Sequence, residues 1–163
     1  MENDDRAVFD CGRESLNAWS RRHAWVNQVS GVSRVNIIAE LGTGRIVGFV
    51  TLSASEIQRV YLPKAQQRNK PDRLPTTLLG QLAVDRAWQG QGYAASLLQF
   101  ALRTALHAAE TIGSIGVITH PLDDELRRFY GRWGFQDLPF DPRRAMIVRT
   151  VDLRRSFVSP DPS

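Results

Sequence analysis

The chain has 163 residues, a formal net charge of +4, and 42% apolar and 23% charged residues. This length fits one domain that buries a hydrophobic core, and these fractions exclude an intrinsically disordered or collagen-like chain. The apolar runs are far shorter than the ~18 residues that a membrane-spanning helix needs, so we expect no membrane association.

Two further features of the composition bear on location and partners. The acidic start Met1-Glu2-Asn3-Asp4-Asp5 differs from a signal or transit peptide, and a single cysteine, Cys11, excludes an internal disulfide. We therefore expect a cytoplasmic protein. Of the 21 basic residues only Lys64 and Lys70 are lysine. Arginine suits bidentate contacts with phosphate, although an arginine-biased genome explains the composition equally well.

The N-terminal part of the chain predicts a helix and a hairpin. Residues 13–29 carry apolar or aromatic residues at helical spacing. Residues 33–40 and 45–52 are rich in Val and Ile, and the turn sequence 41–44 joins them, which predicts an antiparallel hairpin. Residues 61–76 contain three prolines and four basic residues, which predicts a basic loop without regular structure.

The middle of the chain predicts a strand, a turn, a long helix and a second strand. Residues 78–84 form a short apolar strand that leads into the turn 85–92. The helix that follows ends at Gly113. One of its faces is apolar at helical spacing and consists of Ala94, Leu97, Leu98, Ala101, Leu102, Ala105 and Ala109. Residues 115–119 predict a buried strand.

The C-terminal part predicts a further helix and terminal strands. Asp123 is the expected N-cap of a helix that ends at Trp133-Gly134. Strands are expected from Phe135 onward and over 145–151, and residues 156–163 are expected to form a flexible tail. The elements predict one α/β domain, residues 1–155, with a mixed sheet flanked by helices. In it an N-terminal helix and hairpin precede a strand-helix-strand-helix-strand core with a parallel crossover.

The segment with the clearest chemistry is Gln89-Gly90-Gln91-Gly92-Tyr93-Ala94, between an apolar strand and the long helix. Glycine permits unusual dihedrals and close approach of a ligand, and the first amides of a helix bind phosphate oxygens. No Gly-Lys-Ser/Thr follows, so this is not a Walker loop, and the spacing fails the dinucleotide-binding fingerprint. A tight strand-to-helix connection without a ligand is the structural alternative.

Two motifs in this order resemble the Gcn5-related N-acetyltransferases (GNAT). Strand Leu82-Ala83-Val84-Asp85, followed by Gln-x-x-Gly-x-Ala and an Ala/Leu-rich helix, resembles motif A of that family. Phe129-Tyr130-Gly131-Arg132-Trp133-Gly134-Phe135 resembles motif B. The resemblance covers residues 33 to about 151 and implies the GNAT fold, with acetyl-CoA as acetyl donor.

The resemblance also implies roles for single residues. The coenzyme pyrophosphate is expected on the amides of Gln91, Gly92, Tyr93 and Ala94, with Gln89 and Gly90 shaping the loop. The pantetheine arm is expected to pair with Leu82, Ala83 and Val84 like an added strand, where that strand diverges from strand 115–119. Asp123 replaces an asparagine that touches pantetheine in many relatives, and Phe129 is grouped with the same site.

Tyr130 matches the family's general acid, which protonates the departing thiolate; a core tyrosine between Phe129 and Trp133 is the alternative. A backbone N–H at or beside Val84 is expected to stabilise the oxyanion. For the base, Glu56 is the one acid near the end of the second hairpin strand, although a solvated glutamate is the plainer interpretation. His23, His107 and His120 show no partner carboxylate at a readable spacing, and a structural role is the plainer interpretation of His120. No spacing predicts a metal site.

A second resemblance narrows the class. Phe9-Asp10-Cys11-Gly12 and the residues that follow it are similar to the N-terminal signature of acetyltransferase toxins from bacterial toxin–antitoxin modules, as is Leu79-Gly80-Gln81-Leu82-Ala83-Val84-Asp85. Gln81 stands where many of these toxins have arginine. The resemblance spans residues 9 to 151. It implies acetylation of the α-amine of charged tRNA, which blocks translation.

The same resemblance implies the partners of the protein. They are a ribbon-helix-helix antitoxin, operator DNA bound only through the antitoxin complex, and a second copy of the chain in a homodimer. An α-amine has a pKa of about 7.7–8.0, against about 10.4 for lysine, so a weak base suffices for this substrate. Its polyanionic remainder makes seven basic residues candidates for tRNA binding, with a solvated surface as the alternative: Arg21, Arg22, Arg34, Lys64, Arg68, Lys70 and Arg73.

Two other functions stay open from the sequence. One is an acetyltransferase of small amines or protein N-termini, for which the few acids in residues 53–75, Glu56 and Asp72, count mildly against a small-amine substrate. The other is a non-catalytic module that binds acyl-CoA or nucleic acid, against which the retained Tyr130 argues.

Overall fold

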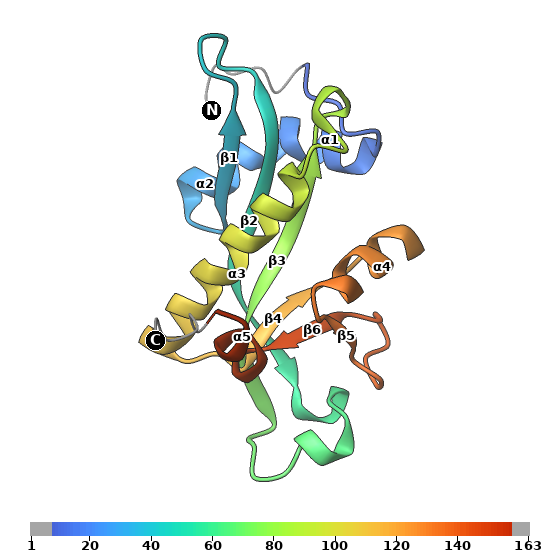
Figure 1. Ribbon diagram of the computed structural model, residues 1–163. Coiled ribbons are helices and arrows are strands. Elements are labelled where there is room, and N and C mark those ends of the chain that lie inside the picture. The colour runs from blue at the N-terminus through green and yellow to red at the C-terminus, as the bar shows by residue number, and fades with distance from the viewer. Residues whose placement is uncertain (1–7, 158–163) are drawn as a thin grey trace, which may run out of the picture. The chain divides into compact units, whose positions relative to one another are not determined.

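The computed structural model describes residues 8–157 (Figure 1). It divides into two compact units, each described by itself. Unit 1 comprises Met1–Ser53 and Leu79–Ala101, and unit 2 comprises Ala54–Leu78 and Leu102–Ser163. The strands form a six-stranded sheet in the order β1-β2-β3-β4-β6-β5, which confirms the predicted mixed α/β class. Within the described range, no helix has the length and apolar character needed to cross a membrane.

The predicted N-terminal helix 13–29 is two helices. Helix α1 spans Glu14–Arg22 and α2 spans Ala24–Ser30, and His23 between them has φ −119°, outside the helical range. Gly31 ends α2 in the left-handed region, with φ 78°. The helical spacing was therefore correct, but it did not predict the break at His23.

The predicted hairpin is confirmed in unit 1. Strands β1 (Arg34–Ala39) and β2 (Ile46–Gln58) are antiparallel, with Arg34 opposite Leu52 and a shift of register after Ile38. Strand β2 continues to Gln58 instead of ending at Leu52. Its first half is buried on both faces, and it then alternates between covered and exposed residues.

The core of unit 1 joins the N-terminal segment to the hairpin. Phe49 is its centre: Trp19 stacks on that ring at 5.9 Å between centroids, and Phe9 packs against it at 5.3 Å. Further core members are Cys11, Leu16, Ile46 and Ala83. Residues 9–19 are thus anchored on the sheet by apolar contacts, which places the polar groups between them close to the end of β3.

The basic segment 61–76 was predicted as an irregular loop, and this is wrong at its C-terminal end. Turns of 3₁₀ helix occupy Arg59–Tyr61 and Lys64–Gln66, and strand β3 then runs from Arg73 to Val84. Pro75 lies inside that strand. Proline lacks an N–H donor but keeps its carbonyl, and the oxygen of Pro75 accepts a bond from Ile115 N at 2.9 Å.

The predicted helix–strand–helix order that follows is confirmed. Helix α3 spans Tyr93–Ile112, strand β4 Gly116–Thr119 and helix α4 Asp124–Arg132. Asp123 caps α4 as expected, because its Oδ1 accepts a bond from Leu126 N at 2.9 Å. The charge of this carboxylate also favours the positive end of the helix dipole.

The C-terminus departs from the predicted strand over 145–151. Strand β5 (Gln136–Asp137) and strand β6 (Met146–Arg149) are antiparallel, and β6 also pairs with β4. Helix α5 then spans Thr150–Phe157, held at its start by Thr150 N, which donates to Ile115 O at 2.8 Å. Ser156 and Phe157 are helical rather than part of the expected tail, and residues 158–163 lie outside the described residues.

Unit 2 has its own apolar core beneath the C-terminal strands. It consists of Ile57, Leu62, Leu74, Ile118, Leu138, Ala145 and Ile147. Leu62 is 1% exposed, so the segment between β2 and β3 is anchored rather than free. Buried side chains of this kind each contribute about 1.5–3 kcal/mol when removed from water.

Strand β4 leaves no room for a side chain at Gly116. A Cβ there would lie 2.5 Å from Val148 O and 3.1 Å from the Ile147 side chain. We predict that Gly116→Ala lowers the free energy of unfolding by about 1–3 kcal/mol, measured by urea denaturation. The control is Gly131→Ala in α4, where nothing lies within 4 Å of the new methyl group and alanine favours the helix. Equal stability of the two variants would contradict this packing.

Candidate active site

The turn between β3 and α3 has the geometry of an anion site. Gly90 has φ 76° and Gly92 has φ 89°, both in the left-handed region that favours glycine. Helix α3 then runs for 20 residues from Tyr93. The first amides of a helix have no intrahelical acceptor and carry the positive end of its dipole. The turn therefore presents N–H groups suited to phosphate oxygens.

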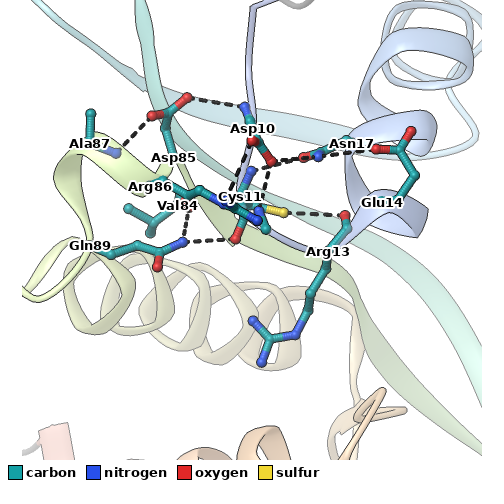
Figure 2. A network of polar contacts seen from close by, with 11 residues as sticks. Asp10, Cys11, Arg13, Glu14, Asn17, Val84, Asp85, Arg86, Ala87 and Gln89 are labelled. Atoms are coloured by element: carbon teal, nitrogen blue, oxygen red, sulfur yellow. Dashed lines mark hydrogen bonds and ion pairs between the residues drawn. The ribbon is translucent and has the colours of Figure 1, made fainter.

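A network of hydrogen bonds fixes this turn from inside unit 1 (Figure 2). Gln89 Nε2 donates to the carbonyl oxygens of Cys11 at 2.8 Å and Val84 at 2.9 Å. Asp85, which is buried, accepts from Ala87 N at 2.9 Å and from Asp10 N at 3.1 Å. The side chains of Asp85, at the start of the turn, and Gln89, within it, thus tie the turn to residues near the N-terminus.

Asp10 is the other centre of the network. Its Oδ1 accepts from Asn17 Nδ2 and Gly12 N, each at 2.9 Å, and its carbonyl accepts from Arg86 N at 2.8 Å. The Asn17 hydrogen bond, followed by the Gly12 amide, holds the pKa of Asp10 below its ordinary value. A Cβ on Gly12 would lie 3.1 Å from Arg86 Nε. We call residues Asp10–Gly12, with their bonds to Asp85, Arg86 and Gln89, the N-terminal clamp.

The single cysteine has a structural place in the clamp. Cys11 is 5% exposed, its N donates to Asn17 Oδ1 at 2.9 Å, and burial raises the pKa of its thiol. A buried thiol with a raised pKa is a poor nucleophile. The sequence motif at residues 9–12 was found by resemblance, but its role in holding the turn through Asp10, Asn17 and Arg86 was missed.

Tyr130 lies on α4 in unit 2 and is 4% exposed. Its ring meets those of Phe129 and Phe135 edge to face, with centroids 5.2 Å and 5.3 Å away. Such contacts restrict the ring to one orientation. The predicted motif 129–135 is therefore a packed aromatic cluster that holds the phenol in place.

Unit 2 contains a cavity of about 610 Å³. Its apolar lining comprises Ile57, Tyr61, Leu78, Ile118 and Ala145. Its polar lining comprises Ser55, Glu56, Gln58, Asp72, Arg73, His120, Asp141 and Arg143. This size and this mixture of apolar walls with a few polar groups are typical of small-ligand pockets.

One of the seven basic residues predicted to bind tRNA, Arg73, lines the cavity. Its Nη1 forms an ion pair with Glu56 Oε1 at 3.7 Å. Carboxylates on the lining outnumber guanidinium groups, so the chain's surplus of basic over acidic residues is not concentrated at the cavity.

The other six candidate tRNA-binding residues lie elsewhere. Arg21, Arg22 and Arg34 belong to unit 1. Arg21 pairs with Glu14, and Lys70 donates to Gln66 O at 2.6 Å. Lys64 and Arg68 are exposed between β2 and β3.

His120 has neighbours that the sequence did not reveal. It directly follows β4, and because Thr119 pairs with Met146, the turn 141–145 comes to its side. Asp141 braces that turn by accepting from Arg143 N at 2.9 Å and Ala145 N at 3.0 Å. Burial, and then the charge of Arg143, lower the pKa of His120 against an opposing effect of Asp141. Asp141 lies far from His120 in the chain, so no sequence spacing revealed this carboxylate.

No group of three or more His, Cys, Asp or Glu side chains placed to hold a metal ion occurs within residues 8–157. Two carboxylates of the cavity lining are instead engaged with guanidinium groups. Asp72 accepts from Arg59 Nη2 at 2.9 Å, in addition to the pair of Glu56 with Arg73. Unit 1 thus provides a turn suited to binding an anion. Unit 2 provides the phenol of Tyr130, held by aromatic contacts, and a cavity whose lining includes the imidazole of His120.

The chain is similar to solved structures of the toxins AtaT and KacT. AtaT complexed with acetyl-methionyl-tRNAfMet matches with a TM-score of 0.89 and 29% identity, over 96% of this chain and 94% of that chain. A tyrosine-to-phenylalanine mutant of AtaT, bound to the C-terminus of the antitoxin AtaR and acetyl-CoA, matches with a TM-score of 0.82 and 26% identity, over 97% and 94%. The KacTA–DNA complex matches with a TM-score of 0.81 and 26% identity, over 96% and 92%.

Sequence comparison agrees. The tRNA-acetylating toxin of Mycobacterium tuberculosis is 37% identical over 145 residues, which cover 89% of this chain and 86% of the relative. The model of the acetyltransferase (GNAT) domain matches residues 33–137, more than half of the chain. With the glycine turn before α3 and the aromatic cluster around Tyr130 in their expected elements, this chain belongs to the GNAT acetyltransferase family.

Proposed function

We propose that this protein transfers the acetyl group of acetyl-CoA to the α-amino group of the amino acid on charged tRNA, and thereby stops translation. The observation that carries the proposal is the 37% identity with the tRNA-acetylating toxin of Mycobacterium tuberculosis over 89% of this chain. The likeness to AtaT bound to acetyl-methionyl-tRNAfMet supports the same substrate class. Acetylation removes the nucleophilic amine that peptide-bond formation needs.

Acetyl-CoA fits the turn before α3. The amides of Gln91, Gly92, Tyr93 and Ala94 bind its pyrophosphate, and Gln89 and Gly90 shape the loop, supported by the left-handed glycines and the bonds of Gln89 to Cys11 O and Val84 O. Leu82, Ala83 and Val84 at the end of β3 pair with the pantetheine arm, and a backbone N–H there stabilises the oxyanion.

Tyr130 is the general acid of the proposed reaction. The amine attacks the thioester carbonyl, the carbon–sulfur bond breaks, and the phenol protonates the departing thiolate. The edge-to-face contacts with Phe129 and Phe135 support this role, because they fix the direction of the ring. Phe129 completes the coenzyme site. In this proposal Asp123, whose Oδ1 caps α4, also lies beside the pantetheine.

The family resemblance supports a set of partners. We propose a ribbon-helix-helix antitoxin, operator DNA reached only through the antitoxin complex, a toxin homodimer and a bacterial cytoplasmic location. AtaT bound to a segment of AtaR, and the KacTA–DNA complex, support the antitoxin and the DNA. Residues 1–155 act as one functional domain in this proposal.

One observation favours a second candidate, an acetyltransferase of small cationic amines. The cavity lining holds three carboxylates, from Glu56, Asp72 and Asp141, which suit a polyamine better than a polyanion. Acetylation of spermidine but not of charged tRNA by the purified protein would establish this alternative. Binding of CoA without any acetylation would establish a non-catalytic module.

We predict that Tyr130→Phe lowers kcat for charged-tRNA acetylation about 100-fold, because the thiolate loses its proton donor. The affinity for acetyl-CoA should stay within about twofold, since the ring and its aromatic contacts are retained. Transfer of radioactive acetyl groups measures the first quantity and calorimetric titration the second. Growth arrest on expression should be relieved by the same change. Unaltered turnover would remove Tyr130 from the mechanism.

We predict that Gln89→Met raises KM for acetyl-CoA roughly tenfold with little change in kcat. The variant removes two hydrogen bonds of about 1 kcal/mol each that hold the turn, yet leaves its glycines and amides in the chain. Gln99→Met, on the exposed side of α3, is the matched control and should keep the wild-type KM. A fall in kcat with unchanged KM would mean that the clamp does not serve coenzyme binding.

We predict that tRNA binding weakens steeply with salt, because the contacts of arginine and lysine with phosphate release counterions. Arg34→Gln and Arg68→Gln should each reduce the slope of log K against log salt by about 1. Arg155→Gln on α5, which carries no proposed tRNA contact, should leave the slope unchanged. Filter binding of charged tRNA at several salt concentrations measures it, and a flat salt dependence would contradict a basic tRNA surface.

A further inference from the structure

We infer that the cavity of unit 2 receives the amino group of the acceptor and that His120 accepts its proton. The inference rests on the proposed acetylation of an α-amine and adds the base that this reaction needs. An α-amine is partly protonated at neutral pH, and an ammonium group has no lone pair with which to attack a carbonyl. A group beside the bound ammonium that accepts this proton therefore supplies the lone pair as the nitrogen attacks.

The lining of the cavity singles out His120 among its titratable groups. Glu56 is 3.7 Å from Arg73, and Asp72 accepts a hydrogen bond from Arg59. Both of these carboxylates are therefore already engaged with guanidinium groups.

Asp141 and Arg143 are the charged groups beside the imidazole. Both oxygens of Asp141 accept backbone N–H groups of its own turn. His120 lines the cavity, and within residues 8–157 no hydrogen bond of its side chain is found.

The environment also sets the protonation state of His120. Partial burial and the positive charge of Arg143 favour the neutral imidazole, and Asp141 opposes them more weakly. The pKa of His120 is therefore lowered, and the ring is an unprotonated base at neutral pH.

The proton balance of the step is complete. His120 takes one proton from the ammonium group and later releases it to water. The neutral nitrogen bonds to the acetyl carbon, and the carbon–sulfur bond breaks with its electron pair on sulfur. The thiolate takes the Tyr130 proton, and the second proton of the former amine restores the Tyr130 hydroxyl. The net products are the acetylated amine, the free thiol and one proton.

The test compares His120→Gln with His107→Gln, an exposed histidine on α3 outside the cavity. The probe is total bacterial tRNA charged with its amino acids, with radioactive acetyl-CoA, assayed from pH 5.5 to 9. His120→Gln should lower kcat about 100-fold below neutral pH. The deficit should shrink above about pH 8, where the amine loses its proton unaided. KM for acetyl-CoA and the profile of His107→Gln should match wild type.

A second variant tests the environment of His120 and retains the imidazole. Arg143→Gln removes a charge that lowers the pKa of His120, so the acidic limb of the kcat profile should move to higher pH. Arg144→Gln, its exposed neighbour outside the lining, should leave that limb in place. The Arg143 variant keeps the inference testable should His120→Gln fail to fold.

The outcomes separate the two proposals. A wild-type protein that acetylates no charged tRNA at any pH contradicts the proposed function and this inference with it. Active wild type together with a His120→Gln variant of unchanged kcat and unchanged profile overturns this inference alone. An acidic limb that stays in place in Arg143→Gln overturns it as well.

Discussion

The hydrogen bonds between the N-terminal clamp and the turn before α3 are the constraint on which unit 1 depends. Left-handed glycines alone allow many loop conformations, and a flexible loop would have to be ordered each time it binds an anion. Gln89 and Asp85 remove this freedom by bonding to backbone groups of residues 10 and 11. Phe9, packed on Phe49, anchors the clamp to the core. Apolar packing thus determines the geometry of a polar turn.

Much of the fold follows from local patterns. The apolar stripe of α3, the cap of α4 at Asp123 and the hairpin of β1 and β2 are encoded within a few neighbouring residues, and all three were predicted. The errors lie where tertiary contacts decide. Thr150 and Val151 favour a strand by their branching, yet they begin α5 because Thr150 bonds to Ile115 and Ser114. Pro75 is a residue type that usually marks a loop, but it lies in a strand and joins the sheet through its carbonyl oxygen, which accepts a hydrogen bond from Ile115 N.

The residues of the candidate site likewise fall into those that the sequence identified and those that it missed. Residues 89–94 and Tyr130 were identified because their motifs are contiguous in the chain. His120, Asp141 and Arg143 were not grouped, because the register of β4 against β6 brings them together. A strand pairing between distant segments is the kind of information that one sequence does not display. The carboxylates of the cavity were likewise counted as sparse, because the turn at residue 141 lies far from residues 53–75 in the chain.

The buried position of Cys11 has a practical consequence. It is the only cysteine in the chain, and its sulfur lies within the clamp, where it contacts the carbonyl oxygen of Arg13 at 3.5 Å. A thiol reagent can reach it only when the clamp opens, so the rate of labelling measures that opening directly. The protein thus carries an intrinsic reporter of loop ordering. Protection of the thiol by added nucleotide coenzyme would reveal the coupling between the two without any engineered probe.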